Sequence, residues 1–376
     1  MKNEDHGALF YGILFIFAAK RCLYKGCSIN VYQMIRTLHA LRFVFILLIM
    51  LSHIIGSAFD FGGECGVSFF FMLSGFVLSL SYGSRVADGS FRTRRFVGRQ
   101  LLKFYPLHLV TLAVFVWLDA RLGRIYDWQH LVPNVLLLQS WIPSDEYFFV
   151  ANGASWFLCD IVFFYSVFAC MWRWLNGLAP KQLAVAGGVT AVLYAVLAFS
   201  IPTEHVNAIL YAAPWTRLLD FCIGILICRF YQSERGQKLR ASLNQSDVRF
   251  RESLTLALLV ASFFAYEALT PRLRCAALFW VVIPPPLLFY AAADRSRGVV
   301  VRLLHHPVLQ RLGDISLEIY LLHMLVFREV HTLLRYAGHH SVWLAGVLCL
   351  VLTIPVAWLV KRYFTDKVFS SLERRV

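Results

Sequence analysis

Apolar segments of about 16–22 residues recur along the chain from residue 40 onward, which is the length that a helix needs to cross the hydrocarbon core of a bilayer. Lipid offers the backbone no hydrogen-bonding partner, so segments of this kind are helical. Hydrophobic residues make up 59% of the sequence and charged residues 15%, which excludes a water-soluble or disordered chain. We therefore predict an all-α polytopic integral membrane protein. Its ten transmembrane helices are expected at residues 40–58, 66–82, 104–118, 154–172, 183–201, 208–230, 254–270, 276–293, 314–334 and 342–360.

The positions of the Lys and Arg residues predict the orientation of these helices. Cytoplasmic loops of membrane proteins carry an excess of positive charge. If the first helix begins in the cytoplasm, 28 of the 36 Lys and Arg residues fall on the cytoplasmic side and 5 on the opposite side. This asymmetry favours an orientation with both termini in the cytoplasm. It also explains the net charge of +14, and we expect no nucleic acid binding because the basic residues alternate with the spans.

Residues 1–33 precede the first of these segments. Their apolar run, Ala8 to Ala19, is short for a span, and no signal-peptide cleavage pattern follows it. We interpret residues 1–33 as an N-terminal extension, either an interfacial helix or the product of a misassigned start, since Met34 stands directly before the first convincing segment. Residues 34–376 then form one membrane-embedded domain. The Cys and His residues lack metal-ligand spacing, so we expect no metal.

Two ionisable residues in the first predicted helix are candidates for function, because charge within a membrane is costly. Arg42 and His53 are eleven positions apart, so both project from one face of a helix, roughly 16 Å apart along its axis. Arg42 could be a snorkelling anchor, and His53 could be a hydrogen-bonding partner of another helix. Alternatively, the imidazole of His53 can take a proton from a hydroxyl near neutral pH.

Other polar or irregular positions allow two interpretations each. A basic run before Tyr105-Pro106 is either an anchor at the lipid headgroups or a binding site for phosphate groups. Arg217 and Asp220 are three positions apart in the sixth predicted helix and could pair with each other. Three consecutive prolines at 284–286 are expected to break or kink the eighth predicted helix.

Six short motifs occur in a fixed order between Leu38 and Val360. Each alone is a weak signal, but together they resemble membrane-embedded acyltransferase family 3, whose members transfer acyl groups, most often acetyl, to sugars at the cell surface. The motifs are Leu41-Arg42 followed by His53, Gly66-Val67 with Phe69–Phe71 and Ser74–Phe76, the basic stretch Arg95–Pro106, Trp156–Leu158, Arg217–Gly224, and Leu312–His323.

This chain departs from the family pattern at two places. It has Gln100-Leu-Leu-Lys103 where the family has Arg-x-x-Arg, with Arg99 one position early. The acid often found five residues after the tryptophan falls on Ile161, and Asp160 stands one position away. The first departure affects the expected phosphate contacts, and the second affects the expected acidic residue.

The resemblance implies an O-acyltransferase in the bacterial cytoplasmic membrane. Its donor is expected to be acyl-CoA, above all acetyl-CoA, as a co-substrate with no bound cofactor, and its acceptor a hydroxyl of a cell-surface or lipid-linked glycan. His53 is expected to act as the general base, and Arg42 to hold an anionic part of CoA or to orient the thioester. The CoA phosphates are expected at Arg95, Arg99 and Lys103, and the supporting residues are Ser74, Trp156, Asp160, Tyr320 and His323.

Two other functions stay open at this level. A transporter or flippase for a lipid-linked sugar would also carry Arg, His and Asp within its helices. A glycosyltransferase or polymerase of polysaccharide assembly usually has large extracytoplasmic catalytic loops, whereas the longest such loop expected here is residues 119–153. Binding of CoA would favour the acyltransferase, since neither alternative requires it.

Overall fold

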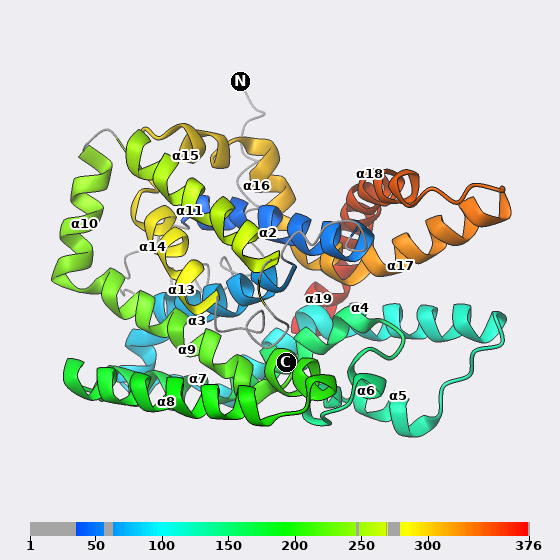
Figure 1. Cartoon of the computed structure of the whole chain (residues 1–376), viewed down its shortest axis with the longest axis horizontal. Helices are drawn as coiled ribbons and strands as arrows, with labels where there is room; N and C mark the ends of the chain where they lie inside the picture. Colours follow the sequence, from blue (N-terminus) through cyan, green and yellow to red (C-terminus); the bar gives the residue numbers. More distant parts are fainter. Residues whose placement is uncertain (1–34, 56–62, 246–247, 268, 270–278, 375–376) are drawn as a thin grey trace.

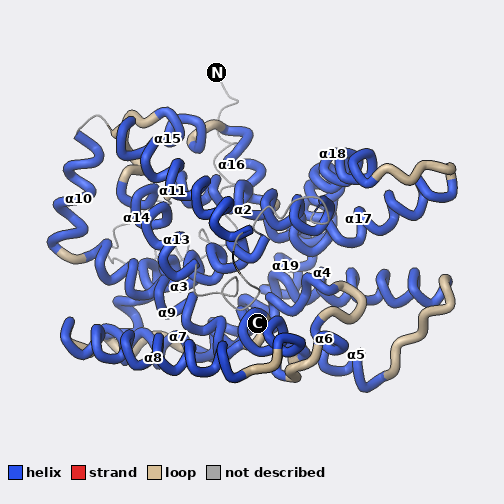
Figure 2. The backbone as a smooth tube through the Cα atoms, in the orientation of Figure 1, coloured by secondary structure: helices blue, strands red, loops and turns tan. Residues whose placement is uncertain are grey.

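The computed structural model of the chain describes residues 35–55, 63–245, 248–267, 269 and 279–374. The regular elements in these ranges are all helices, with no strand among them, which confirms the predicted all-α class (Figures 1 and 2). The predicted N-terminal extension, residues 1–33, and the adjoining Met34 lie outside the described residues.

The long helices follow the predicted apolar segments in order along the chain. They are α2 (Arg36–Ile55), α3 (Gly63–Ala87), α4 (Thr93–Arg121), α7 (Trp156–Gly177), α8 (Pro180–Ser200), α9 (Pro214–Gln232), α11 (Arg249–Glu267), α17 (Ser316–Tyr336) and α18 (Val342–Val360). Shorter pieces connect or extend them: α5 (Trp128–Val135), α6 (Asp145–Phe148), α10 (Glu234–Gln245), α13 (Phe279–Val282), α14 (Pro284–Ala292), α15 (Val299–Leu304), α16 (Pro307–Asp314), the π-helical turns η5 (Asn207–Tyr211) and η6 (Lys361–Thr365), and α19 (Asp366–Glu373).

Six helices are long and apolar enough to cross a membrane, by length and composition, within the described ranges. A seventh span results if Thr203–Tyr211 and α9, which meet at 45°, form one broken helix. The eighth predicted helix is interrupted as expected, because α13 ends at Val282 and α14 begins at Pro284, and proline fits the first turn of a helix but not its interior. The number of ten spans and the orientation of the termini stay predictions.

Helices α3 and α9 approach each other so closely that their backbones touch. A Cβ at Gly75 would lie 2.1 Å from the carbonyl oxygen of Phe221, and one at Gly224 would lie 1.9 Å from that of Met72. Only glycine leaves room for this contact, which is a common way for helices to pack in lipid, where dispersion replaces the hydrophobic effect.

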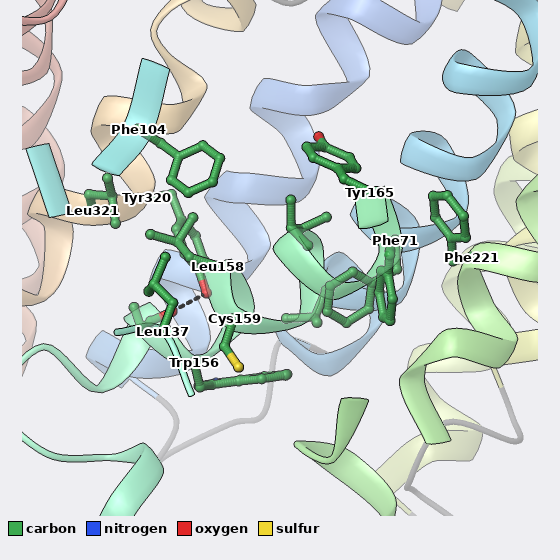
Figure 3. Packing of buried hydrophobic residues seen from close by; sticks show 14 of the residues in the cluster. Phe71, Phe104, Leu137, Trp156, Leu158, Cys159, Tyr165, Phe221, Tyr320 and Leu321 are labelled. Atoms are coloured by element: carbon green, nitrogen blue, oxygen red, sulfur yellow. Dashed lines mark hydrogen bonds between the residues drawn. The ribbon is translucent and has the colours of Figure 1, made fainter. Parts of the chain in front are cut away.

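Aromatic side chains surround this contact and hold α7 against it. Phe71 of α3 stacks on Phe157 with ring centroids 4.6 Å apart, and meets Phe164 edge to face at 5.0 Å. Phe221 of α9 stacks on the same Phe164 at 5.3 Å. Figure 3 shows Phe71 and Phe221 among the buried residues beside α7. Helices α3, α7 and α9 therefore share one aromatic cluster and form one packed unit.

We expect Gly75→Ala and Gly224→Ala each to destabilise the protein, because the added methyl group would press on the backbone of the neighbouring helix. Overpacking of this kind costs about 1–3 kcal/mol or more. Gly187→Ala in α8 is the matched control, since a Cβ there meets nothing within 4 Å. Thermal unfolding in detergent should show a lower midpoint for the first two variants only. Equal midpoints for all three would contradict the close packing of α3 on α9.

Candidate active site

A cavity opens among α2, α3, α4, α7 and α17, at the end of the bundle where α2 begins. It contains about 1250 Å³ of empty space, part of it open to solvent. Its wall combines apolar side chains with a small set of polar ones. The polar residues of the wall are Arg42, Ser74, Ser81, Tyr82, Gln100, Lys103, Tyr165, Asp314, Ser316, Glu318, Tyr320 and Lys361.

Three side chains of the cavity are buried cations. Arg42 of α2 is 8% exposed, Lys103 of α4 is 7% exposed and Lys361 of η6 is 9% exposed. The Nζ of Lys103 donates to Oε1 of Gln100 at 3.1 Å, and the Nζ of Lys361 lies 3.4 Å from Oδ1 of Asp366. Arg42 makes no hydrogen bond or ion pair with any residue that the structure describes. Because buried cations need anionic or hydrogen-bonding partners, this cavity suits an anionic ligand.

Two acids also face the cavity, and they differ in their partners. The Oδ1 of Asp314 lies 3.0 Å from Nε2 of the buried His39. Glu318 of α17 is only 1% exposed, and its Oε2 accepts no hydrogen bond from the described part of the chain. Glu318 is therefore a buried carboxylate with unused capacity to accept hydrogen bonds.

The second candidate residue of α2, His53, is hydrogen-bonded to His323 of α17. Its Nδ1 lies 2.9 Å from Nε2 of His323, and Nδ1 of His323 lies 2.6 Å from the carbonyl oxygen of Tyr320. A carbonyl oxygen only accepts, so His323 donates through Nδ1 and, when neutral, accepts through Nε2. His53 must then donate through Nδ1, which leaves the lone pair on its Nε2. These hydrogen bonds set His53 in a tautomer suited to a general base.

Tyr320 connects the histidine pair to the cavity. Its side chain lines the cavity, its ring centroid lies 5.9 Å from that of His323, and its hydroxyl donates to the carbonyl oxygen of Ala154 at 2.6 Å. His323 is fully buried, whereas the side chain of His53 is exposed. Neither histidine lines the cavity itself. The candidate base, His53, therefore lies further along α2 than Arg42 and the other cations of the cavity. Tyr320 lies between the cavity and the histidines.

The structure separates the three cations that the sequence predicts as one phosphate site. Lys103 lines the cavity, but Arg99 forms an ion pair with Glu373 of α19, and Arg95 is exposed in the first turn of α4. Arg95 and Lys103 are eight positions apart, which is roughly 12 Å along a helix. A ligand inside the cavity therefore meets Lys103, and Arg95 lies outside the wall.

The predicted supporting residues also divide into two groups. Ser74 and Tyr320 line the cavity, whereas Trp156, Asp160 and His323 do not. The ring of Trp156 meets that of Phe71 edge to face, with centroids 6.2 Å apart. Asp160 is completely buried, and its carboxylate oxygens accept no hydrogen bond from any described residue. Trp156 and Asp160 therefore lie in the helix packing beside the cavity and not in its wall.

Arg217 and Asp220 form the ion pair that their spacing predicts. Nη1 of Arg217 lies 3.1 Å from Oδ2 of Asp220, and both side chains are fully buried. Nη2 of Arg217 donates to Oγ of Ser68 at 3.0 Å, and Nε1 of Trp280 donates to Oδ1 of Asp220 at 2.8 Å. These bonds join α9 to α3 and α13, so the pair holds helices together outside the cavity wall.

Lys361 and Glu318 are among the charged residues of the cavity to which sequence reasoning assigns no role. Lys361 directly follows an apolar helix, where a lysine is typical of a headgroup anchor. Glu318 lies within the Leu312–His323 motif, but the motif does not indicate which side of α17 faces a cavity. One signal was present in both cases, because each is a charge within or next to a predicted span.

Comparisons with known proteins agree with the resemblance that the motifs indicate. A family model described as an acyltransferase domain matches residues 35–362, which include the cavity and the histidine pair. The chain is 30% identical over 313 residues to acyltransferase MdmB of Streptomyces mycarofaciens, an alignment that covers 77% of this chain and 76% of that protein. No solved structure matches the chain.

We expect Asp220→Asn to lower the free energy of unfolding by about 3–5 kcal/mol, because it leaves the buried guanidinium of Arg217 without its counter-charge. The double variant Arg217→Leu/Asp220→Leu removes both charges and should be less destabilised than the single one. Thermal unfolding of the purified variants in detergent measures both effects. A double variant that unfolds at a lower temperature than Asp220→Asn would contradict this account.

Proposed function

This chain belongs to the acyltransferase family, and we propose that it moves an acyl group, most often acetyl, from cytoplasmic acyl-CoA to a hydroxyl of a cell-surface or lipid-linked glycan. The family match and the acyltransferase relative support acyl transfer by a membrane protein. The observation that carries the finer proposal is the hydrogen bond between His53 and His323, which prepares a base on the helix that also carries Arg42.

The cavity supplies the donor site in this proposal. CoA is strongly anionic through its phosphate groups, and three buried cations, Arg42, Lys103 and Lys361, line the wall. Hydrogen bonds between such cations and phosphate oxygens are charge-assisted and stronger than neutral ones. Under the predicted orientation, this end of the bundle faces the cytoplasm, where acyl-CoA is made.

His53 performs the proton transfer. Its Nε2 removes the proton of the acceptor hydroxyl as the hydroxyl oxygen attacks the thioester carbonyl carbon. A carbon–oxygen bond forms, the carbon–sulfur bond breaks, and the resulting imidazolium returns the proton to the departing thiolate. The products are an ester and free CoA. His323 accepts the Nδ1–H of His53 throughout and so keeps the base in its tautomer.

The distance between Arg42 and His53 along α2 determines how long the bound donor must be. Arg42 and His53 lie roughly 16 Å apart along the helix axis. The extended arm of the donor can be held at the level of Arg42 while its thioester carbonyl lies near the base at the other level. Holding both reactants on one helix converts a bimolecular step into an intramolecular one.

We propose the bacterial cytoplasmic membrane as the location, with ten spans and both termini in the cytoplasm. The asymmetric distribution of the 36 Lys and Arg residues supports this orientation. The glycan acceptor would then approach the exposed His53 from the opposite side of the membrane, which separates the donor and acceptor entrances.

We expect His53→Ala to lower the rate of acetyl transfer by about 10²- to 10⁴-fold, because the hydroxyl loses its proton acceptor. The measurement is transfer from labelled acetyl-CoA in membranes containing the variant. His331→Ala, a second histidine on α17 near Phe327, is the matched control and should keep the wild-type rate. Transfer by His53→Ala at the wild-type rate would show that another group acts as the base.

We expect His323→Ala to lower kcat on the order of 10²-fold and to leave KM for acetyl-CoA nearly unchanged, because the base is misplaced and the donor cavity is intact. His323→Gln offers a side-chain oxygen to the Nδ1–H of His53 and should recover part of the rate. If His323→Gln were as slow as His323→Ala while both remained folded, orientation of His53 by an acceptor would be excluded.

A further inference from the structure

Arg42 and Glu318 carry opposite charges in the same cavity but do not pair with each other. Both are buried, at 8% and 1% exposure, and both line the wall. The carboxylates of Asp314 and Glu318 are the acids whose field acts on Arg42, yet no ion pair joins them to it. Within the described residues, Oε2 of Glu318 also has no hydrogen-bond donor.

None of the charged side chains near Glu318 forms an ion pair with its carboxylate within the described residues. Lys361 is the cation that acts on it most strongly, but the Nζ of Lys361 lies 3.4 Å from the carboxylate of Asp366 and forms its ion pair there. The side chain of Thr365 and the backbone of Glu318 also stabilise this carboxylate, so its unused capacity to accept a hydrogen bond lies on Oε2. Arg42 lies on α2 and Glu318 on α17, and both side chains line the same cavity.

A group that fits between them must accept from a guanidinium and donate to a carboxylate. A phosphate satisfies only the first condition, because Glu318 would repel it. A secondary amide satisfies both, with its carbonyl oxygen toward Arg42 and its N–H toward Glu318. The pantetheine arm of CoA contains two such amides between the phosphates and the thioester.

We propose that Arg42 and Glu318 together bind an amide of the pantetheine arm, and that Lys103 and Lys361 are left to meet the phosphates. Glu318 is then a specificity residue that selects a pantetheine thioester over an acyl phosphate or a simple thioester. This inference rests on the proposed function, and it names the part of the donor that the cavity recognises.

The test compares three donors with purified protein in lipid nanodiscs: acetyl-CoA, S-acetylpantetheine and the amide-free S-acetyl-2-mercaptoethanol. Glu318→Leu removes the acceptor, and Glu318→Gln keeps an oxygen that can accept the amide N–H. Glu329→Leu, on the same helix but outside the cavity wall, is the matched control.

We expect Glu318→Leu to raise KM for acetyl-CoA and S-acetylpantetheine about 10-fold or more, which is the usual effect of losing a hydrogen bond to a charged group. KM for the amide-free donor should not change, and Glu318→Gln should stay within about 3-fold of the wild type for all three donors. Glu329→Leu should match the wild type.

Several outcomes would overturn the proposal. Equal changes for all three donors would show that Glu318 does not contact an amide, and so would no change for any. If Glu318→Leu does not fold, Glu318→Gln decides alone: a 10-fold rise in its KM for S-acetylpantetheine would show that the charge matters and not the acceptor. A wild-type protein that neither binds CoA nor uses acetyl-CoA would instead refute the proposed function.

Discussion

The contact between α3 and α9 is the constraint on which the rest of the bundle depends. Two glycines, Gly75 and Gly224, allow the backbones of α3 and α9 to touch. The short separation of these two helices positions the side chains that pack around them. On one side of the contact the aromatic cluster fixes α7 through Phe164. On the same two helices, Nη2 of Arg217 in α9 donates to Oγ of Ser68 in α3. The cavity is the space that this packed unit leaves toward α2, α4 and α17.

The candidate site consists of few residues, and each helix contributes them at a particular height in the bundle. Helix α2 carries Arg42 and His53, and α17 supplies a side chain at each of the two levels, Glu318 in the cavity and His323 beside the base. The small number of charged residues is expected in lipid, because each additional charge within a span is costly and needs a partner or a ligand. Arg42 and Glu318 are the exception that points to a ligand.

Sequence patterns predict what lies on one helix better than what lies between helices. The eleven-residue spacing correctly places Arg42 and His53 on one helix, and the three-residue spacing of Arg217 and Asp220 predicts their ion pair. The bond from His53 to His323 joins positions 270 apart in the chain, so no local periodicity contains it. The same holds for the ion pair that takes Arg99 away from the predicted phosphate site and for Lys361, which continues the helix after α18 and lines the cavity.

Contacts between early and late helices of the chain bear on how the protein is synthesised. His53 contacts His323, His39 contacts Asp314, and Arg99 contacts Glu373. The first residue of each contact is synthesised long before the second. During membrane insertion α2 and α4 therefore enter the bilayer before these particular contacts can form. The nascent chain therefore has no assembled site until α17 to α19 have left the ribosome, and a product truncated before them is left with buried charges for the cell's quality control to recognise.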